Sequence, residues 1–321
     1  MSRPCGLLIG LLLAAGAGVA GQQRPVFRTT ADLVTIDVAV RSRNTPVAGL
    51  KAEDFEVFDN GVRQQVEMLD ATSLPIDLTV VLDISGSMMT LVGPMTKYAN
   101  TVLDMLQADD RLRIIKVGTY VSQPVGFSRA TGQLEVEEIT PGEMTSLYDG
   151  LAAAMMRSRE PDRRHVIVAL TDGIDTTSSL ELSAVEGIAR RTDSVLYVVR
   201  PMATGTGAFP DRPLRANTRN RWMMPRVRFG VGGAPFAGGE ALDDLGLAPL
   251  AEQTGGRFEF VFATPGGLPS AVKIVLDTFR HSYVLRYHAT GVTRAGWHEV
   301  TVKLPKHIGA EIRARKGYFG G

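Results

Sequence analysis

The sequence predicts an α/β fold in which a mostly parallel sheet, with helices on both faces, is inserted in a small antiparallel β-domain. Between Ile76 and about Phe279, apolar strands alternate with helical stripes, as in a parallel sheet whose two faces are covered by helices. The flanking segments, residues 31–72 and 281–318, contain strand patterns separated by turns. Neither segment has enough strands for a stable sheet, whereas together they have about six. We therefore expect one β-domain, a sheet or a small sandwich, built from both; two separate small β-domains are the alternative.

The composition is that of a globular protein. Apolar residues make up 44% of the 321 residues and charged residues 21%, which argues against a disordered chain. Lys and Arg number 35 and Asp and Glu 34. This balance gives no general argument for binding to nucleic acid or to an acidic membrane surface, and we expect no nucleic-acid partner.

Residues 1–20 have the pattern of a signal peptide. Arg3 precedes an apolar run over residues 7–15, and small residues at 18–20 offer a cleavage site. A membrane anchor is the alternative, but the run is shorter than the ~20 residues that a span needs. We therefore expect export to the periplasm or the outside, with no membrane span after cleavage. The single cysteine, Cys5, lies inside this segment, so cysteine catalysis and zinc–thiolate sites are excluded for the mature chain.

The flanking segments divide into strands by their alternation of apolar and polar residues. The N-terminal strands are predicted at Leu33–Val40, Phe55–Phe58 and Gln64–Leu69, the last two joined by a hairpin turn at Asn60-Gly61. The C-terminal strands are predicted at Ser282–His288, Trp297–Leu304 and Ala310–Arg315.

The central region alternates regularly. Its strands are predicted at Ile76–Leu82, Leu112–Val117, Tyr120–Phe127, Val166–Leu170, Val195–Val199 and Phe258–Phe260. Helical stripes cover residues 95–106, 147–155, 241–253 and 268–279. Ser178 and Glu181 have the spacing of a capping box, which predicts another helix start there.

Residues 201–240 interrupt this alternation with a Gly-, Pro- and Arg-rich stretch. A long loop without regular structure is either functional or disordered. Its arginines could bind an acidic surface, and the simpler interpretation is a flexible, solvated insertion.

Three short polar motifs follow predicted strands or precede predicted helices in the central region. They are Asp83-x-Ser85-x-Ser87, Thr145, and Asp172 in Leu-Thr-Asp-Gly. In open α/β sheets, ligands gather beyond the carboxyl ends of the strands, so these oxygens would converge on one rim. Carboxylate and hydroxyl oxygens suit Mg²⁺, which often keeps an open position for water or a partner's oxygen.

These pieces resemble the metal-ion-dependent adhesion site (MIDAS) of a von Willebrand factor A (VWA) domain. The resemblance rests on three motifs in the expected order: Asp-Ile-Ser-Gly-Ser-Met at 83–88, a Thr before Leu-Tyr-Asp-Gly-Leu, and Leu-Thr-Asp-Gly at 170–173. It covers residues 76–280. The flanks, Gly-Leu-Lys-Ala-Glu-Asp-Phe-Glu-Val-Phe-Asp-Asn-Gly at 49–61 and Arg-Ala-Arg-Lys-Gly-Tyr-Phe at 313–319, are similar to those of exported VWA-related proteins abundant in acidobacteria.

The resemblance implies a Rossmann-like VWA sheet with one short antiparallel edge strand. It implies a Mg²⁺ site, open also to Mn²⁺ or Ca²⁺, that docks an Asp or Glu of a protein partner in adhesion or assembly, without catalysis. The implied metal-holding residues, directly or through water, are Asp83, Ser85, Ser87, Thr145 and Asp172.

The chain departs from the family pattern beside Thr145. Met144 stands where the pattern has Gly, and Glu143 precedes it. A bulky Met could alter the loop, and Glu143 could reach the rim and partly neutralise the cation, so both are possible modulators of the site.

Two other functions use the same rim. A metal-dependent hydrolase or phosphatase could use Asp83 as a nucleophile, although Gly-x-Ser-x-Gly and phosphate-loop motifs are absent around the first strand of the region. A scaffold with a vestigial metal site is the third hypothesis. Around the rim, we expect Asp149 to interact with the first turn of its own helix and not with a ligand, and residues 176–178 to serve a helix start. We expect Asp175 to face solvent, with support of the metal-holding residues as the alternative.

Overall fold

The computed structural model describes residues 33–43, 45–71, 74–86, 88, 95–129, 132–135, 144–157, 160, 162–203, 246–263 and 267–321. The predicted signal peptide, most of the 201–240 insertion, Ser87 and Glu143 lie outside these residues. Among the described residues, no helix has the length and apolarity needed to cross a membrane.

A six-stranded sheet forms the centre of the α/β part, in the order β11-β10-β9-β6-β7-β8. All neighbouring pairs are parallel except β7 and β8, which are antiparallel, so β8 is the antiparallel edge strand. The strands are β6 (Ile76–Asp83), β7 (Arg111–Val117), β8 (Val121–Arg129), β9 (Arg164–Leu170), β10 (Val195–Ala203) and β11 (Arg257–Ala263). All eight residues of β6 are buried, because helices cover both faces of this mostly parallel sheet.

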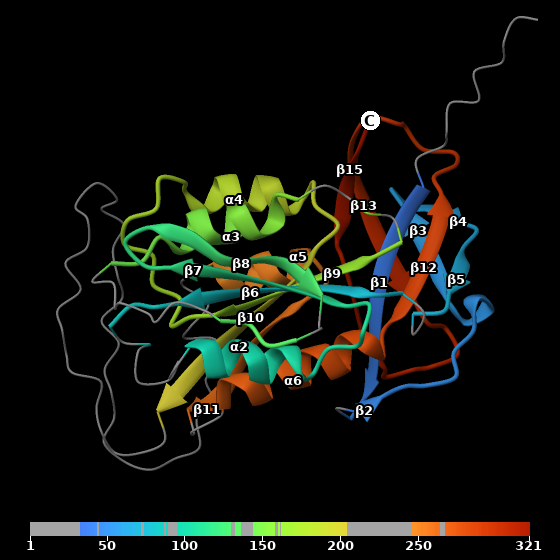
Figure 1. The fold of residues 1–321 in the computed structure, drawn as a ribbon. Helices are drawn as coiled ribbons and strands as arrows, with labels where there is room; N and C mark the ends of the chain where they lie inside the picture. Colours follow the sequence, from blue (N-terminus) through green and yellow to red (C-terminus); the bar gives the residue numbers. More distant parts are fainter. Residues whose placement is uncertain are drawn as a thin grey trace, which may run out of the picture. The chain divides into compact units, whose positions relative to one another are not determined.

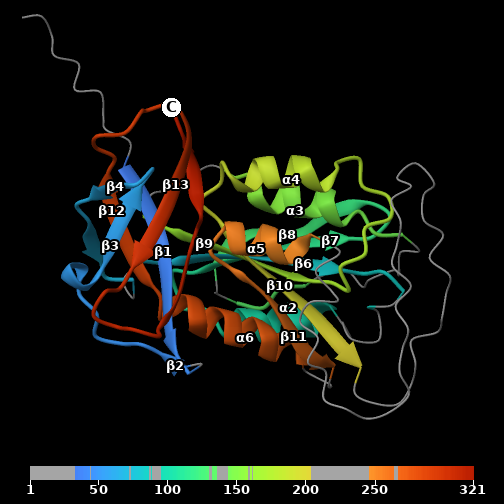
Figure 2. The same ribbon diagram turned by 180° about the vertical axis from the view of Figure 1, so that it is seen from behind.

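Helices lie on both faces of the sheet (Figures 1 and 2). One face packs against α2 (Met95–Leu103) and α6 (Gly267–Arg280). The other packs against α3 (Leu147–Met155), α4 (Leu182–Ala189) and α5 (Leu247–Gln253). This arrangement confirms the predicted α/β class.

The flanking segments form two antiparallel sheets, which we call the β-sandwich. One sheet has the order β14-β1-β12-β5, with β2 paired to β1, and the other has the order β15-β13-β3-β4. The N-terminal strands are β1 (Leu33–Ser42), β2 (Thr45–Pro46), β3 (Glu56–Asp59), β4 (Val62–Gln64) and β5 (Glu67–Leu69), with a 3-10 turn at Ala52–Asp54. The C-terminal strands are β12 (Tyr283–His288), β13 (Gly296–Lys303), β14 (Glu311–Ala314) and β15 (Gly317–Gly320).

Strands from the two flanking segments alternate in the first sheet and pair through β13 and β3 in the second. Neither segment could build these sheets alone, which confirms the β-domain made of both. The prediction of one strand over Gln64–Leu69 is wrong. β4 pairs with β3, and β5 crosses to the other sheet to pair with β12. The Gln64 side chain fixes this crossover, because its amide bonds to the backbone N–H and C=O of Thr290 at 3.0 Å each.

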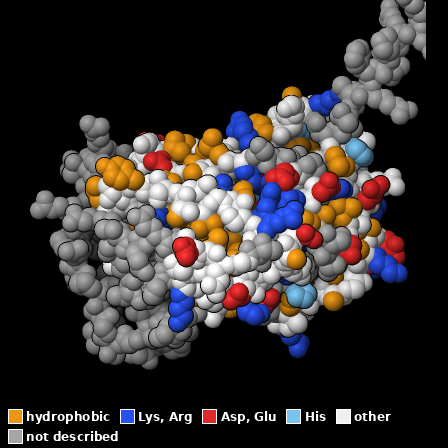
Figure 3. Space-filling model, in the orientation of Figure 1, with side chains coloured by type: hydrophobic (Ala, Val, Ile, Leu, Met, Phe, Trp, Pro, Cys, Tyr) orange, Lys and Arg blue, Asp and Glu red, His pale blue; other side chains and the backbone are white. Residues whose placement is uncertain are grey.

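The two sheets of the β-sandwich enclose one apolar core, to which β1 contributes alternate residues such as Ile36 and Val38. The intervening residues of β1 face the α/β part. Asp37 Oδ1 accepts a hydrogen bond of 2.7 Å from Nε of Arg164, the first residue of β9. Arg164 also donates to the carbonyl of Phe279 at 2.7 Å. Figure 3 shows Lys and Arg side chains beside Asp and Glu side chains over this junction.

The β-sandwich therefore meets the end of the central sheet where β6 and β9 begin. We call this end the base, and the opposite end, where β6 and β9 finish, the rim. An eight-residue strand is about 26 Å long. The residues that hold the sandwich and the residues predicted to bind metal thus lie at opposite ends of the same strands.

Candidate metal centre

Asp83 is the last residue of β6 and its side chain is fully buried, with 0% exposure. Its Oδ1 accepts a hydrogen bond of 2.9 Å from the backbone N–H of Ser85, and its Oδ2 accepts one of 2.7 Å from Thr171 Oγ1. Within the described part of the chain, no basic side chain pairs with it. Burial raises the pKa of Asp83, the nearby charge of Asp172 raises it further, and the hydrogen bonds from Thr171 and Ser85 offset part of the effect.

Asp172 supplies a second carboxylate just beyond the end of β9. Its Oδ1 accepts a hydrogen bond of 3.0 Å from the backbone N–H of Ile174. The turn is completed by Gly173, which has a φ of +89° and donates its N–H to Thr171 Oγ1 at 2.9 Å. Two carboxylates close enough to affect each other's ionisation repel unless a cation lies between them.

Thr145 is buried, with 3% exposure, just before α3. Its N–H donates to Thr176 Oγ1 at 2.7 Å, and its carbonyl accepts from the N–H groups of Thr176 and Thr177 at 2.9 and 3.2 Å. The loop after β9 therefore holds Thr145 in place. The expectation that Thr176 and Thr177 serve a helix start is wrong.

The same loop is tied to the first turn of α3 by two further carboxylates. Asp175 Oδ1 accepts from the N–H of Tyr148 at 3.2 Å and from the Ser178 hydroxyl. Asp149 accepts from the N–H groups of Ser179 and Leu180 at 2.9 Å each. Asp175 is thus not merely solvent-facing, and Asp149 bonds to a neighbouring loop and not to its own helix.

The predicted capping box at Ser178 is also wrong. α4 begins at Leu182 with Glu181 as its N-cap residue, and no side chain caps it. The Ser178 hydroxyl is engaged elsewhere: it accepts from the N–H of Asp149 at 3.1 Å. Asp175 and Ser178 therefore accept from N–H groups in the first turn of α3 and not of α4, a contact between distant segments that local sequence spacing does not reveal.

The structure thus places four of the five predicted metal residues at one rim: Asp83 and Ser85 at the end of β6, Asp172 after β9 and Thr145 before α3. Ser87 and Glu143 lie outside the described residues. Met144 is 43% exposed, so its side chain points toward solvent while Thr145 beside it stays buried. Sequence reasoning missed Thr171 and Thr176, which hydrogen-bond to Asp83 and Thr145. For Thr171, its position inside the Thr-Asp-Gly motif could have indicated a role at the site.

The donors described at this rim suit a hard divalent cation. Among the described residues there is no group of three or more His, Cys, Asp and Glu side chains that could hold a metal. The donors here are instead two carboxylates supplemented by hydroxyls, all of them oxygen, which fits Mg²⁺ or Mn²⁺ better than a thiolate- or imidazole-binding metal.

The strand order, the antiparallel edge strand β8 and the convergence of the three motifs on one rim agree with the resemblance in the sequence. This is the fold of a VWA domain. It is carried here on a β-sandwich that is built from the segments before and after it.

Comparisons with known proteins add the following. No family model matches the chain, and no curated protein matches it. Among solved structures, it resembles the ArnB paralog VWA2 from Sulfolobus acidocaldarius, with 14% identity over 75% of this chain and 54% of that one and a TM-score of 0.40. The von Willebrand factor type A protein from Catenulispora acidiphila has 11% identity over 89% of this chain and 73% of that one, with a TM-score of 0.42.

A third similar structure is the manganese-loaded TRAP protein of Plasmodium vivax, with 15% identity over 81% of this chain and 97% of that one and a TM-score of 0.38. The chain spans about half the length of the first of these proteins, 54%. These likenesses are weak, and the VWA fold is assigned from the strand order and the rim residues of this chain itself.

Proposed function

We propose that this protein is an exported, metal-dependent binding module whose VWA rim docks an acidic side chain of a partner protein, in adhesion or assembly. One observation carries the proposal: the fully buried carboxylate of Asp83 lies near a second carboxylate, Asp172, and has no cationic partner among the described residues. A buried carboxylate is costly unless it is paired or coordinates a metal.

The residues that would hold the cation are Asp83, Ser85, Ser87, Thr145 and Asp172, and Mg²⁺ is the proposed ion, with Mn²⁺ or Ca²⁺ as alternatives. When bound, the cation supplies an electrophilic position that a carboxylate from another molecule can occupy. The chain's own residues orient the donors. Ser85 N–H and Thr171 Oγ1 fix the Asp83 carboxylate, and Thr176 fixes the Thr145 backbone.

Two residues beside Thr145 would tune this docking. Met144 would contribute an exposed apolar contact to the partner, since the residue is 43% exposed. Glu143 would lower the positive charge of the occupied site and weaken attraction for an acidic partner.

Binding is favoured over hydrolysis by the placement of Asp83. A nucleophilic carboxylate must reach the reacting atom of its substrate, whereas both oxygens of Asp83 accept hydrogen bonds in a fully buried position. Each oxygen keeps a further lone pair, which is enough to hold a small cation directly or through water. We propose that the module is not an enzyme, that it is exported through the signal peptide at residues 1–20, and that it has no nucleic-acid partner.

Selection from a random peptide display library tests this function. The mature protein is immobilised in Mg²⁺, and bound peptides are eluted with EDTA. We expect eluted peptides to be enriched in Asp or Glu, and enrichment to disappear for Asp83→Asn. Asp104→Asn is the matched control, because Asp104 is an exposed carboxylate just beyond the last residue of α2. Equal enrichment with wild type and Asp83→Asn, or no acidic bias, would contradict the proposal.

A further inference from the structure

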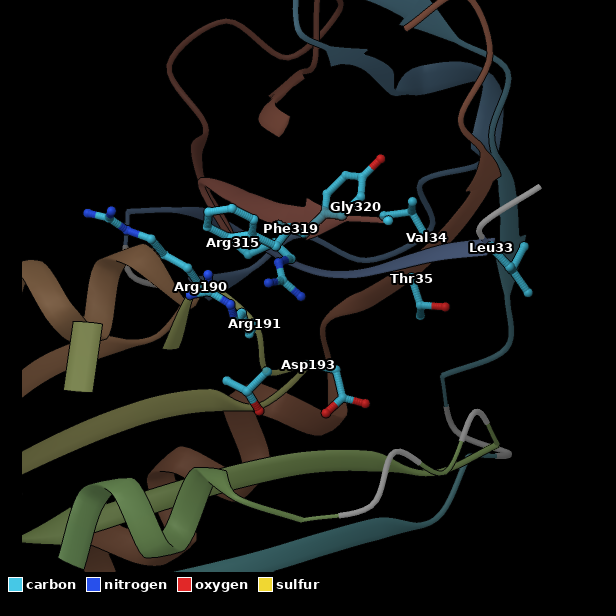
Figure 4. Close-up of a pocket in the computed structure, with 12 residues that line it drawn as sticks. Leu33, Val34, Thr35, Arg190, Arg191, Asp193, Arg315, Phe319 and Gly320 are labelled. Atoms are coloured by element: carbon cyan, nitrogen blue, oxygen red, sulfur yellow. The ribbon is translucent and has the colours of Figure 1, made fainter. Parts of the chain in front are cut away.

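A second hollow lies at the base, away from the proposed metal centre. Its volume is about 240 Å³, and it is lined by the start of β1, the turn between α4 and β10, and the last strand, β15 (Figure 4). Residues that matter to its chemistry are Thr35, Arg190, Arg191, Asp193, Arg315 and Phe319. Both the α/β part and the β-sandwich therefore contribute to its walls.

Aromatic side chains of the sandwich hold two of these arginines. The guanidinium of Arg191 lies 4.1 Å from the ring centre of Phe319, and that of Arg190 lies 5.6 Å from the ring of Trp297. The two rings pack edge to face at 5.7 Å. Stacking on an aromatic face orients the planar group and leaves the N–H groups at its edge able to donate.

The side chains that line the hollow include three arginines and one aspartate, so their net charge is positive. Neither Arg190 nor Arg191 forms an ion pair with any described residue, and Arg191 donates to the carbonyl of Gly187 at 2.9 Å. Arg315 adds a third guanidinium, whose Nε donates to the carbonyl of Gly317 at 2.8 Å. Asp193 is the acidic side chain described in the lining, and its Oδ1 already faces Arg157 Nη2 at 3.5 Å.

We propose that this hollow binds a phosphate-type oxyanion, either free phosphate or the phosphomonoester group of a larger ligand. Guanidinium groups recognise phosphate by paired N–H···O bonds, and clusters of arginines are a recurring means of binding it. The alternative is that Arg190 and Arg191 only pack on the aromatic rings, while their charges interact favourably with the negative, C-terminal end of the α4 dipole. In that case phosphate would not bind.

Isothermal titration of the mature protein with inorganic phosphate tests the proposal, with phenyl phosphate as a second arm that represents an ester. We expect saturable binding at one site, with an affinity reduced at least about tenfold in Arg191→Gln. Arg313→Gln is the matched control, because Arg313 lies on β14, is paired with Glu311 and is not part of the lining. Tighter binding of phenyl phosphate than of phosphate identifies an ester as the ligand type.

Three results would overturn the proposal: no saturable heat up to about 10 mM phosphate, the same affinity in Arg191→Gln as in Arg313→Gln, or equal competition by chloride at matched ionic strength. Arg191→Lys provides a second check that does not depend on the loss of charge. Lysine keeps the positive charge but lacks the planar guanidinium that donates two parallel hydrogen bonds to phosphate, so we expect weaker phosphate binding at an unchanged melting temperature.

Discussion

Asp77 and Asp83 are two carboxylates of one strand, β6, and both have 0% exposure. Asp77 lies at the base, where Arg111 Nε and Arg163 Nε each donate to its Oδ1 at 2.7 Å. A third arginine, Arg157, has its Nη1 3.7 Å from Asp77 Oδ2. Asp83 lies at the rim and accepts only from a backbone N–H and hydroxyl groups among the described residues.

The pKa values of these two residues move in opposite directions. Burial raises the pKa of Asp77, but the hydrogen bonds and the positive charges of Arg111 and Arg163 together outweigh burial and hold its pKa below the usual value. Burial also raises the pKa of Asp83, and the donors there do not outweigh it. The two aspartates have the same residue type and the same burial, so their pKa values differ because arginines contact Asp77 and only uncharged donors contact Asp83 among the described residues. The arginines at the base neutralise Asp77, whereas no basic side chain of the described residues pairs with Asp83, and we propose that a metal ion supplies the positive charge there.

The largest expected effect is that of Asp77→Asn. This change leaves Arg111, Arg157 and Arg163 without their shared carboxylate, and breaking such a buried pair costs about 3 kcal/mol or more. Asp83→Asn in the absence of metal removes a charge that burial disfavours, so we expect unchanged or higher stability. Urea unfolding in EDTA measures both. Equal losses for the two variants would show that the ends of β6 do not differ in the way described.

The next effect concerns α3, which follows Thr145 at the rim. A Cβ atom added at Gly150 would lie 2.0 Å from Cγ1 of Val117, so Gly150→Ala forces α3 away from β7. We expect a loss of about 2 kcal/mol in the free energy of unfolding. Gly187→Ala in α4 is the control, since its added Cβ would be 3.9 Å from the flexible end of Arg191. That control is expected to be neutral or slightly stabilising. A similar loss in both variants would contradict the packing argument.

A smaller effect is a pH dependence that arises at the base. His165 is buried and its two ring nitrogens contact the hydroxyls of Thr79 and Ser194. Burial, followed by the charges of Arg157, Arg113 and Arg111, lowers its pKa well below the usual value. As the pH falls below about 6.5, the unfolded chain takes up a proton that the folded protein does not, so stability falls with decreasing pH.

The expected slope from His165 is at most about 1.4 kcal/mol per pH unit, and it extends from the unfolded-state pKa down to the lowered folded-state pKa. Unfolding of the wild type and of His165→Gln between pH 7 and pH 5 measures it. The prediction is a shallower slope in the variant. Identical slopes would mean that another group titrates, and the neutral, buried state of His165 would have to be given up.

Local patterns in the sequence predicted the central sheet and its rim. The apolar run of β6 that ends at Asp83 marked a buried strand, and the alternation with helices placed Thr145 and Asp172 beyond the ends of neighbouring elements. These features depend on periodicity and on chain direction, which a sequence shows directly.

Contacts between residues far apart in the chain could not be predicted in the same way. The division of Gln64–Leu69 between two sheets depends on Thr290, which is 226 residues from Gln64. Asp149 in α3 bonds to the loop after β9, and Asp175 in that loop bonds to the first turn of α3, about thirty residues away in each case, where local rules suggest solvent exposure or contacts within one helix. Asp77 stood inside an apolar run, and only the structure shows the arginines of β7 and of the loop before β9 that surround it.

Thermal unfolding in Mg²⁺ tests the central claim most directly. It measures whether a cation bound at the rim stabilises the buried carboxylate of Asp83, as the arginines at the base stabilise that of Asp77. Wild type, Asp83→Asn and the control Asp104→Asn are compared in EDTA and in excess Mg²⁺. At a hundred times the dissociation constant, binding to the folded state alone stabilises it by about 2.7 kcal/mol. We predict this gain for wild type and Asp104→Asn, and none for Asp83→Asn. No gain in wild type, or an equal gain in Asp83→Asn, would contradict a metal site at Asp83.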